Sequence, residues 1–144
     1  MPALQNWIAW ALLSAAFAAL TAIFAKIGLE GIDSDYATLL RTGIIAVVLT
    51  GMVVALGKWR DPTTLPTRSL AFLTLSGLAT GASWLCYFRA LKVGDASKVA
   101  PIDKLSVVLV VVFATIFLGE RPSLRDWVAV GLVTSGVLLL AFKR

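Results

Sequence analysis

The chain has 144 residues, of which 59% are hydrophobic and 15% charged, with a formal net charge of +5 and a mean hydropathy of +0.90. Soluble domains average about 45–50% apolar and about 25% charged residues, so this composition excludes a soluble domain. The basic residues form no run, which argues against nucleic-acid binding. With no histidine and a single cysteine, Cys86, the chain has neither an internal disulfide nor the usual ligands of a metal site, and we expect no cofactor.

Five apolar windows follow one another along the chain, each with the roughly 20 residues that a membrane-spanning helix needs. Period-two alternation is missing from them, and lipid admits only helices and closed barrels. The residues before the first window carry no positive charge, so we expect a retained helix and not a signal peptide. The sequence therefore predicts an all-α membrane protein, a single domain over residues 1–144 that forms a bundle of five transmembrane helices at about residues 6–28, 35–56, 69–91, 97–118 and 124–142.

The basic residues of the connecting loops only weakly indicate which way the chain is oriented in the membrane. Five helices place the two termini on opposite sides of the membrane, and four basic residues inside the windows are set aside. The two sides then carry five and four basic residues, a near balance that is typical of a chain inserting in both orientations. The five are Lys58, Arg60, Arg68, Arg121 and Arg125, and the four are Lys92, Lys98, Lys143 and Arg144.

Four basic residues lie within the predicted helices or at their last turns, all toward the same side. A basic group at the bilayer centre costs about 2.5–3.5 kcal/mol on insertion scales. Four of them converging from four helices predict a cavity that holds an anion. The alternative is that they reach the lipid headgroups or pair with Glu30, Asp35 and Asp103. The four residues are Lys26, Arg41, Arg89 and Lys104.

Asp103 directly precedes Lys104 in the fourth predicted helix. Neighbours on a helix point about 100° apart, so we do not expect these two side chains to pair with each other. One would face the cavity while the other pairs with a neighbouring helix, for example Asp103 with Arg89.

Polar side chains recur at spacings of three and four along the third predicted helix, ending at Tyr87, with Trp84 beside them. Such a stripe faces protein or water, so we expect this helix to line a pathway; interhelical hydrogen bonding alone is the alternative. The residues of the stripe are Ser76, Thr80, Ser83 and Tyr87. No set of nucleophile, base and orienting residue appears, so an enzyme is not expected.

Four motifs follow one another along the second half of the chain: YFRAL at residues 87–91, GDASKVAP at 94–101, LGER at 118–121 and GVLLL at 136–140. In this order they resemble the motifs of the EamA domain, a family of the drug/metabolite transporter superfamily. The resemblance covers nearly the whole chain and implies the short, five-helix type of the family. Such a chain is half of a ten-helix inverted-repeat fold, which an antiparallel homodimer restores. The departure lies in the fourth helix, where family members often carry a central proline and this chain has Leu105, Ser106 and Val107.

From the resemblance and the buried charges together, we expect a secondary transporter of a small anionic or zwitterionic metabolite in a bacterial-type inner membrane. The predicted substrate-binding residues are Lys26, Arg41, Trp84, Tyr87, Arg89, Asp103 and Lys104, and the expected partners are lipid, the substrate and a second copy of the chain. The alternatives are a flippase subunit for a phosphorylated lipid carrier and a small multidrug-type exporter. The second is disfavoured because the first helix has no acidic residue before Glu30.

Overall fold

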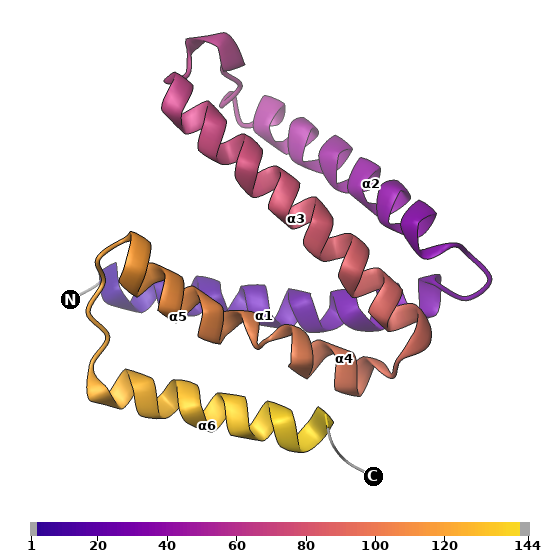
Figure 1. Ribbon diagram of the computed structural model, residues 1–144. Helices are drawn as coiled ribbons and strands as arrows, with labels where there is room; N and C mark the ends of the chain where they lie inside the picture. The colour runs from indigo at the N-terminus through magenta and orange to yellow at the C-terminus, as the bar shows by residue number, and fades with distance from the viewer. Residues whose placement is uncertain (1–2, 142–144) are drawn as a thin grey trace. The chain divides into compact units, whose positions relative to one another are not determined.

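The computed structural model describes residues 3–141, and within that range it contains helices and no strand (Figure 1). The helices are α1 (Ala3–Gly28), α2 (Ser34–Ala55), η1 (Pro62–Thr64), α3 (Thr67–Val93), α4 (Ala96–Asp103), α5 (Ser106–Phe117) and α6 (Leu124–Ala141). The all-α prediction is confirmed. The last residue of the fifth predicted helix, Phe142, and two residues of the charge count, Lys143 and Arg144, lie outside the described range.

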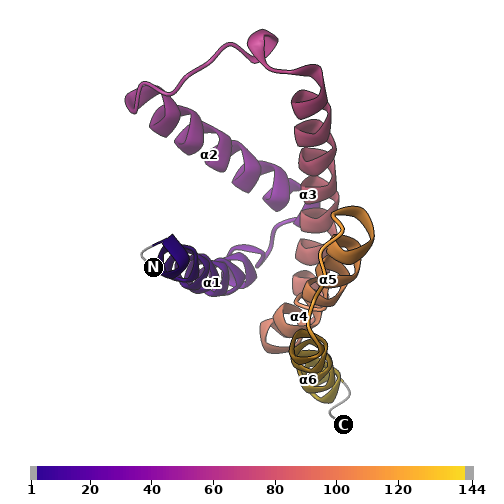
Figure 2. The ribbon, with the colours of Figure 1, turned by 90° about the vertical axis from the view of Figure 1, so that its left-hand side faces the viewer.

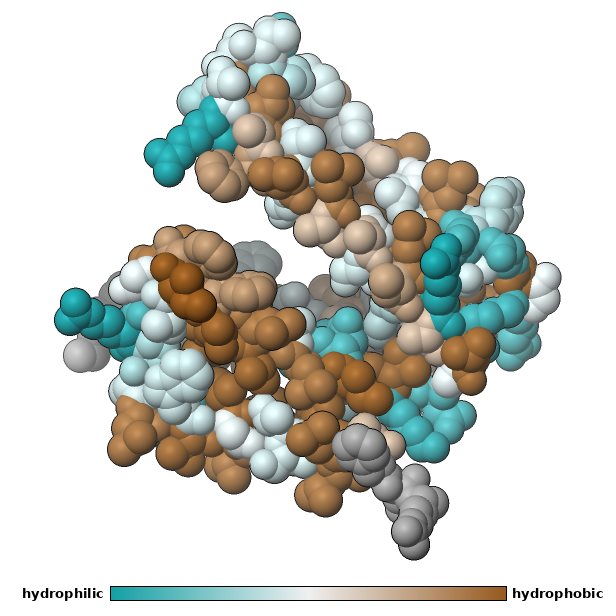
Figure 3. Space-filling view, in the orientation of Figure 1, coloured by the Kyte–Doolittle hydropathy of each residue, from teal (hydrophilic) through white to brown (hydrophobic). Residues whose placement is uncertain are grey.

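Five of these segments are long and apolar enough to cross a membrane: Trp7–Gly28, Ser34–Ala55, Thr67–Val93, Ala96–Phe117 and Leu124–Ala141. Their large apolar side chains are mostly exposed; Leu39, Val47 and Leu78, for example, expose two thirds or more of their surface. Figure 3 shows the same property as extensive brown areas. Side chains of this kind are stable in contact with acyl chains and not with water, so the five predicted transmembrane helices are confirmed.

The contacts within the chain divide it into two compact units, one made of residues 23–93 and the other of residues 1–22 with 94–144. In the unit of residues 23–93, the last turns of α1 precede an antiparallel pair formed by α2 and α3. Figure 2 shows that α2 and α3 lie close together at the Ser34 end and separate toward η1. The buried side chains of this unit gather at the close end: Leu29, Thr38, Phe88 and Leu91.

In the other unit, α6 packs against α4 and, less extensively, against α5. The fourth predicted helix is interrupted here: α4 ends at Asp103 and α5 begins at Ser106, within one apolar span. Backbone amides of residues 104, 105, 107 and 108 bond to carbonyls three residues earlier, at 3.0 Å each. This tighter bonding begins at the carbonyl of Pro101, the proline inside α4. The fourth predicted span is therefore present, at Ala96–Phe117, with an interruption that the sequence analysis did not predict.

Candidate functional site

Five of the seven predicted site residues lie in the unit of residues 23–93: Lys26, Arg41, Trp84, Tyr87 and Arg89. The other two, Asp103 and Lys104, belong to the second unit. The four predicted basic residues differ in what contacts them. Oxygen atoms bind Lys26, Arg89 and Lys104, whereas Arg41 lies against aromatic rings.

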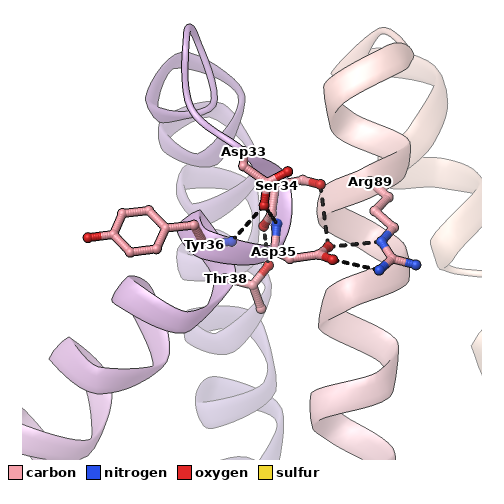
Figure 4. Close-up of polar contacts among 6 residues, drawn as sticks. All are labelled: Asp33, Ser34, Asp35, Tyr36, Thr38 and Arg89. Atoms are coloured by element: carbon pink, nitrogen blue, oxygen red, sulfur yellow. Dashed lines mark hydrogen bonds and ion pairs between the residues drawn. The ribbon is translucent and has the colours of Figure 1, made fainter.

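Arg89 is bound by a carboxylate at the close end of the α2–α3 pair (Figure 4). Its Nε and Nη2 donate to the two carboxylate oxygens of Asp35 at 2.8 and 2.6 Å, a two-pronged geometry that fixes both planes. Asp35 lies in the first turn of α2. There the side chain of Asp33 accepts hydrogen bonds from the backbone amides of Asp35 and Tyr36, at 2.9 and 3.0 Å. The pairing of Arg89 with Asp35 is one of the alternatives that the sequence left open.

Two lysines join the turn after α1 to the end of α3. The Nζ of Lys26 donates to the carbonyl of Leu91 at 2.7 Å, and the Nζ of Lys92 donates to the carbonyls of Leu29 and Ile32 at 2.8 and 2.5 Å. Carbonyls at a helix end have no partner within the helix and carry the negative end of its dipole. Each ammonium therefore stabilises the end of the other helix, around a hollow of about 240 Å³ that Glu30 also lines.

Arg41 lies against aromatic rings. Its Cζ is 4.2 Å from the ring centroid of Trp84 and 5.3 Å from that of Phe88, distances that permit cation–π attraction. Trp84 and Phe88 are four residues apart on α3 and so share one face. No carboxylate forms an ion pair with Arg41 among the side chains that the structure describes.

The depth of Arg41 makes this arrangement unusual for a charged residue. It stands seven residues after Ser34, so about 10 Å of helix separate it from the start of the span. The rings attract the cation but accept no conventional hydrogen bond, and the guanidinium carries five N–H donors. An arginine held in this way has donors in place for an anion.

Tyr87 contributes to the same aromatic group. Its ring meets that of Phe88 edge to face, with centroids 6.4 Å apart. Thr80, from the predicted polar stripe, donates its hydroxyl to the carbonyl of Ser76 at 2.8 Å, a bond within its own helix. That bond satisfies the hydroxyl within its own helix, so it is neither a pathway contact nor the interhelical hydrogen bond that was the alternative.

In the second unit, the Nζ of Lys104 lies 3.3 Å from Oδ2 of Asp103. The expectation that these neighbours do not pair was wrong. The 100° separation holds only inside a helix, and α4 ends between them: Lys104 is the C-terminal cap residue, after which the chain turns before α5. The suggested partner for Asp103, Arg89, is bound to Asp35 instead.

Sequence reasoning missed two participants. Phe88, which is 3% exposed, entered the sequence analysis only as part of the YFRAL motif. Its spacing of four residues from Trp84 places both rings on the same face of α3 and could have identified it. Lys92 was counted only for orientation, although a lysine in the last turn of a helix commonly binds carbonyls. No group of three or more metal-ligating side chains occurs within the part of the chain that the structure describes.

Fold and site together define an integral membrane protein with basic side chains inside its spans. The family model of the EamA-like transporter family matches residues 5–142. The chain therefore belongs to the EamA-like transporter family.

Individual relatives agree with this assignment. An uncharacterized transporter in the cobO 3′ region of Sinorhizobium sp is 58% identical over 137 residues, which are 95% of this chain and 97% of that protein. The uncharacterized transporter YxxF of Bacillus subtilis (strain 168) is 26% identical over 138 residues, and there the chain covers 43% of the relative.

A probable 4-amino-4-deoxy-L-arabinose-phosphoundecaprenol flippase subunit, ArnE of Yersinia pestis (strain Pestoides F), is 30% identical over 74 residues. These residues are 51% of this chain and 65% of the relative. No solved structure matches the chain.

Proposed function

We propose that this protein is a secondary transporter that moves a small anionic or zwitterionic metabolite across a bacterial inner membrane by alternating access. The observation that supports the proposal is the position of Arg41, inside a membrane span, stacked on Trp84 and without a carboxylate partner among the described side chains. A guanidinium there is costly in lipid, so a bound anion offsets part of its cost.

The proposal assigns different roles to the predicted site residues. Arg41 is the substrate contact in this proposal, Trp84 holds it by cation–π attraction, and Tyr87, three residues after Trp84 on α3, adds a hydroxyl. Arg89 and Lys26 are positioning residues, because a carboxylate and a carbonyl already bind them. Lys104 and Asp103 neutralise each other at the helix interruption and contribute no net charge in that state.

An antiparallel homodimer completes the transporter in this proposal. Five helices correspond to half of an inverted-repeat fold, and two copies inserted in opposite orientations restore the pseudo-symmetry on which alternating access depends. The near balance of basic residues between the two sides supports both orientations. A C-terminal fusion reporter should then give signal from both sides of the membrane, and signal from one side alone would contradict the dimer.

The transport proposal is tested in proteoliposomes supplied with an isotope-labelled bacterial metabolite extract, with the internal contents read by mass spectrometry. Arg41→Ala should reduce uptake of the accumulated anion about 10- to 100-fold, as expected when one charged hydrogen-bonding contact of about 1.5–3 kcal/mol is removed.

Arg68→Ala is the matched control. Arg68 also lies over an aromatic ring, that of Phe72 at 6.0 Å, but in the first turn of α3. If both variants transport as well as the parent, or if both lose activity equally, Arg41 is not the substrate contact.

A second candidate is a flippase subunit for a phosphorylated lipid carrier. The similarity to the Yersinia flippase subunit favours it. It predicts that a phosphorylated polyprenol copurifies with the protein and that Arg41→Ala, but not Arg68→Ala, loses it. Mass spectrometry of the lipids in the purified protein distinguishes this candidate from a carrier of water-soluble metabolites.

A further inference from the structure

A groove of about 500 Å³ runs between α5 and α6, beside the loop that connects them. One end is lined by charged side chains, Glu120, Arg121 and Asp126. The rest is lined by small and branched apolar side chains of both helices, among them Val111, Ala114 and Val130. The groove is thus polar at one end and apolar along its length.

The connecting loop fixes the charged end. Gly119 has a φ of +68°, a left-handed conformation that favours glycine, and it ends α5. The amides of Leu118 and Glu120 both bond to the carbonyl of Ala114, at 3.0 and 3.2 Å. The LGER motif therefore builds a helix cap that presents Glu120 and Arg121 in succession beside the groove.

The three charged residues differ in what already binds them. Oδ2 of Asp126 accepts hydrogen bonds from the amide and the hydroxyl of Ser123, both at 2.7 Å. This carboxylate therefore takes part in the N-terminal cap of α6. Glu120 and Arg121 form no hydrogen bond or ion pair with any other described side chain. One anionic and one cationic group are therefore unoccupied at the same end of the groove.

The groove crosses the expected boundary of the membrane. The spans that flank it end at Phe117 and begin at Leu124, so the charged loop lies just outside both of them. The apolar wall lies inside: Val110 is seven residues before Phe117, about 10 Å into the span. A lipid has the same layout, with a charged headgroup above an acyl chain.

We infer that this groove binds phosphatidylethanolamine. Arg121 contacts the phosphate, Glu120 accepts a hydrogen bond from the primary ammonium, and an acyl chain follows the apolar wall between α5 and α6. The charges match, because a headgroup with one phosphate and one ammonium meets one guanidinium and one carboxylate. Phosphatidylglycerol would bring its negative charge near two carboxylates, and the quaternary ammonium of phosphatidylcholine has no N–H to donate.

This site is independent of Arg41 and of transport. The test uses the full chain in nanodiscs made from equal parts of phosphatidylethanolamine, phosphatidylglycerol and phosphatidylcholine, followed by native mass spectrometry of the retained lipid. The parent should retain phosphatidylethanolamine preferentially. Arg121→Ala and Glu120→Gln should each reduce its occupancy about 10-fold, as expected for one lost charged hydrogen bond.

Arg125→Ala removes a charge from the start of α6 without altering the groove lining, so it should retain the lipid like the parent. Circular dichroism verifies that each variant is folded, and Arg121→Lys, which keeps the charge, should bind more lipid than Arg121→Ala. Equal retention of the three lipids, a preference for phosphatidylglycerol, or unchanged occupancy in both groove variants would overturn the inference.

Discussion

The guanidinium of Arg89 and the carboxylate of Asp35 form two parallel hydrogen bonds, of 2.8 and 2.6 Å, between the third and second membrane spans. Residues 54 apart in sequence are thereby joined where the backbone of α2 begins. The pair thereby joins the first turn of α2 to the C-terminal half of α3.

Removing one member of this pair should destabilise the protein more than removing both. Arg89→Gln leaves Asp35 charged and unpaired, whereas the Asp35→Asn/Arg89→Gln double variant leaves two neutral groups. Thermal unfolding in detergent should give the lowest midpoint for each single variant and an intermediate one for the double variant. Strictly additive losses would show that the two residues do not interact.

Leu91 is 0% exposed and should be the most sensitive apolar position on α3. We expect Leu91→Ala to lower the free energy of unfolding by about 2–5 kcal/mol, the usual range for a large-to-small change at a buried position. Leu78→Ala is the matched control, because Leu78 is on the same helix and 67% exposed. Similar losses in the two variants, measured by denaturant unfolding, would contradict this packing.

Lys92 should hold the turn after α1. Replacing it with methionine keeps most of the aliphatic chain but removes the donor to Leu29 and Ile32, a loss of about 1.5 kcal/mol for hydrogen bonds from a charged group. Amide hydrogen exchange of residues 29–33 should become faster. Lys98→Met, which removes only an ion pair with Asp95, should leave those amides as they are in the parent.

The Asp103–Lys104 pair stands about 10–12 Å inside its span, at the interruption between α4 and α5. Lys104→Met leaves an unpaired carboxylate there, which should cost up to about 2.5–3.5 kcal/mol, the insertion penalty of a charge at the bilayer centre. Asp103→Asn/Lys104→Met should recover most of this loss. If the double variant inserts and unfolds no better than the single one, the two charges do not compensate each other.

Acidification should loosen the connector between α2 and α3. The amide and hydroxyl of Thr63 bond to the carboxylate of Asp61 at 2.9 and 2.8 Å and hold its pKa below the ordinary value. A lowered pKa means that this stabilisation is present above the ordinary aspartate pKa and is lost as pH falls through the folded-state value. The amide resonance of Thr63 should report this titration, and Asp61→Asn should abolish it.

Much of the fold was predictable because hydropathy depends on composition over about 20 residues and not on tertiary contacts. All five spans follow from the apolar windows, and the ends of each agree with its window to within two residues. The interruption of the fourth was not predicted, because the window that contains it remains apolar and hydropathy does not report backbone hydrogen bonding. The same interruption made the angular argument about Asp103 and Lys104 fail.

The sequence by itself determined that basic residues lie inside the membrane, since a charge in an apolar window is visible without a structure. Only the tertiary structure decided what binds each of them: a carboxylate for Arg89, helix-end carbonyls for Lys26 and Lys92, aromatic rings for Arg41. The physical reason is that a partner more than 40 residues away is selected by the register of two helices. Hydropathy determines that a helix crosses the membrane but leaves that register open.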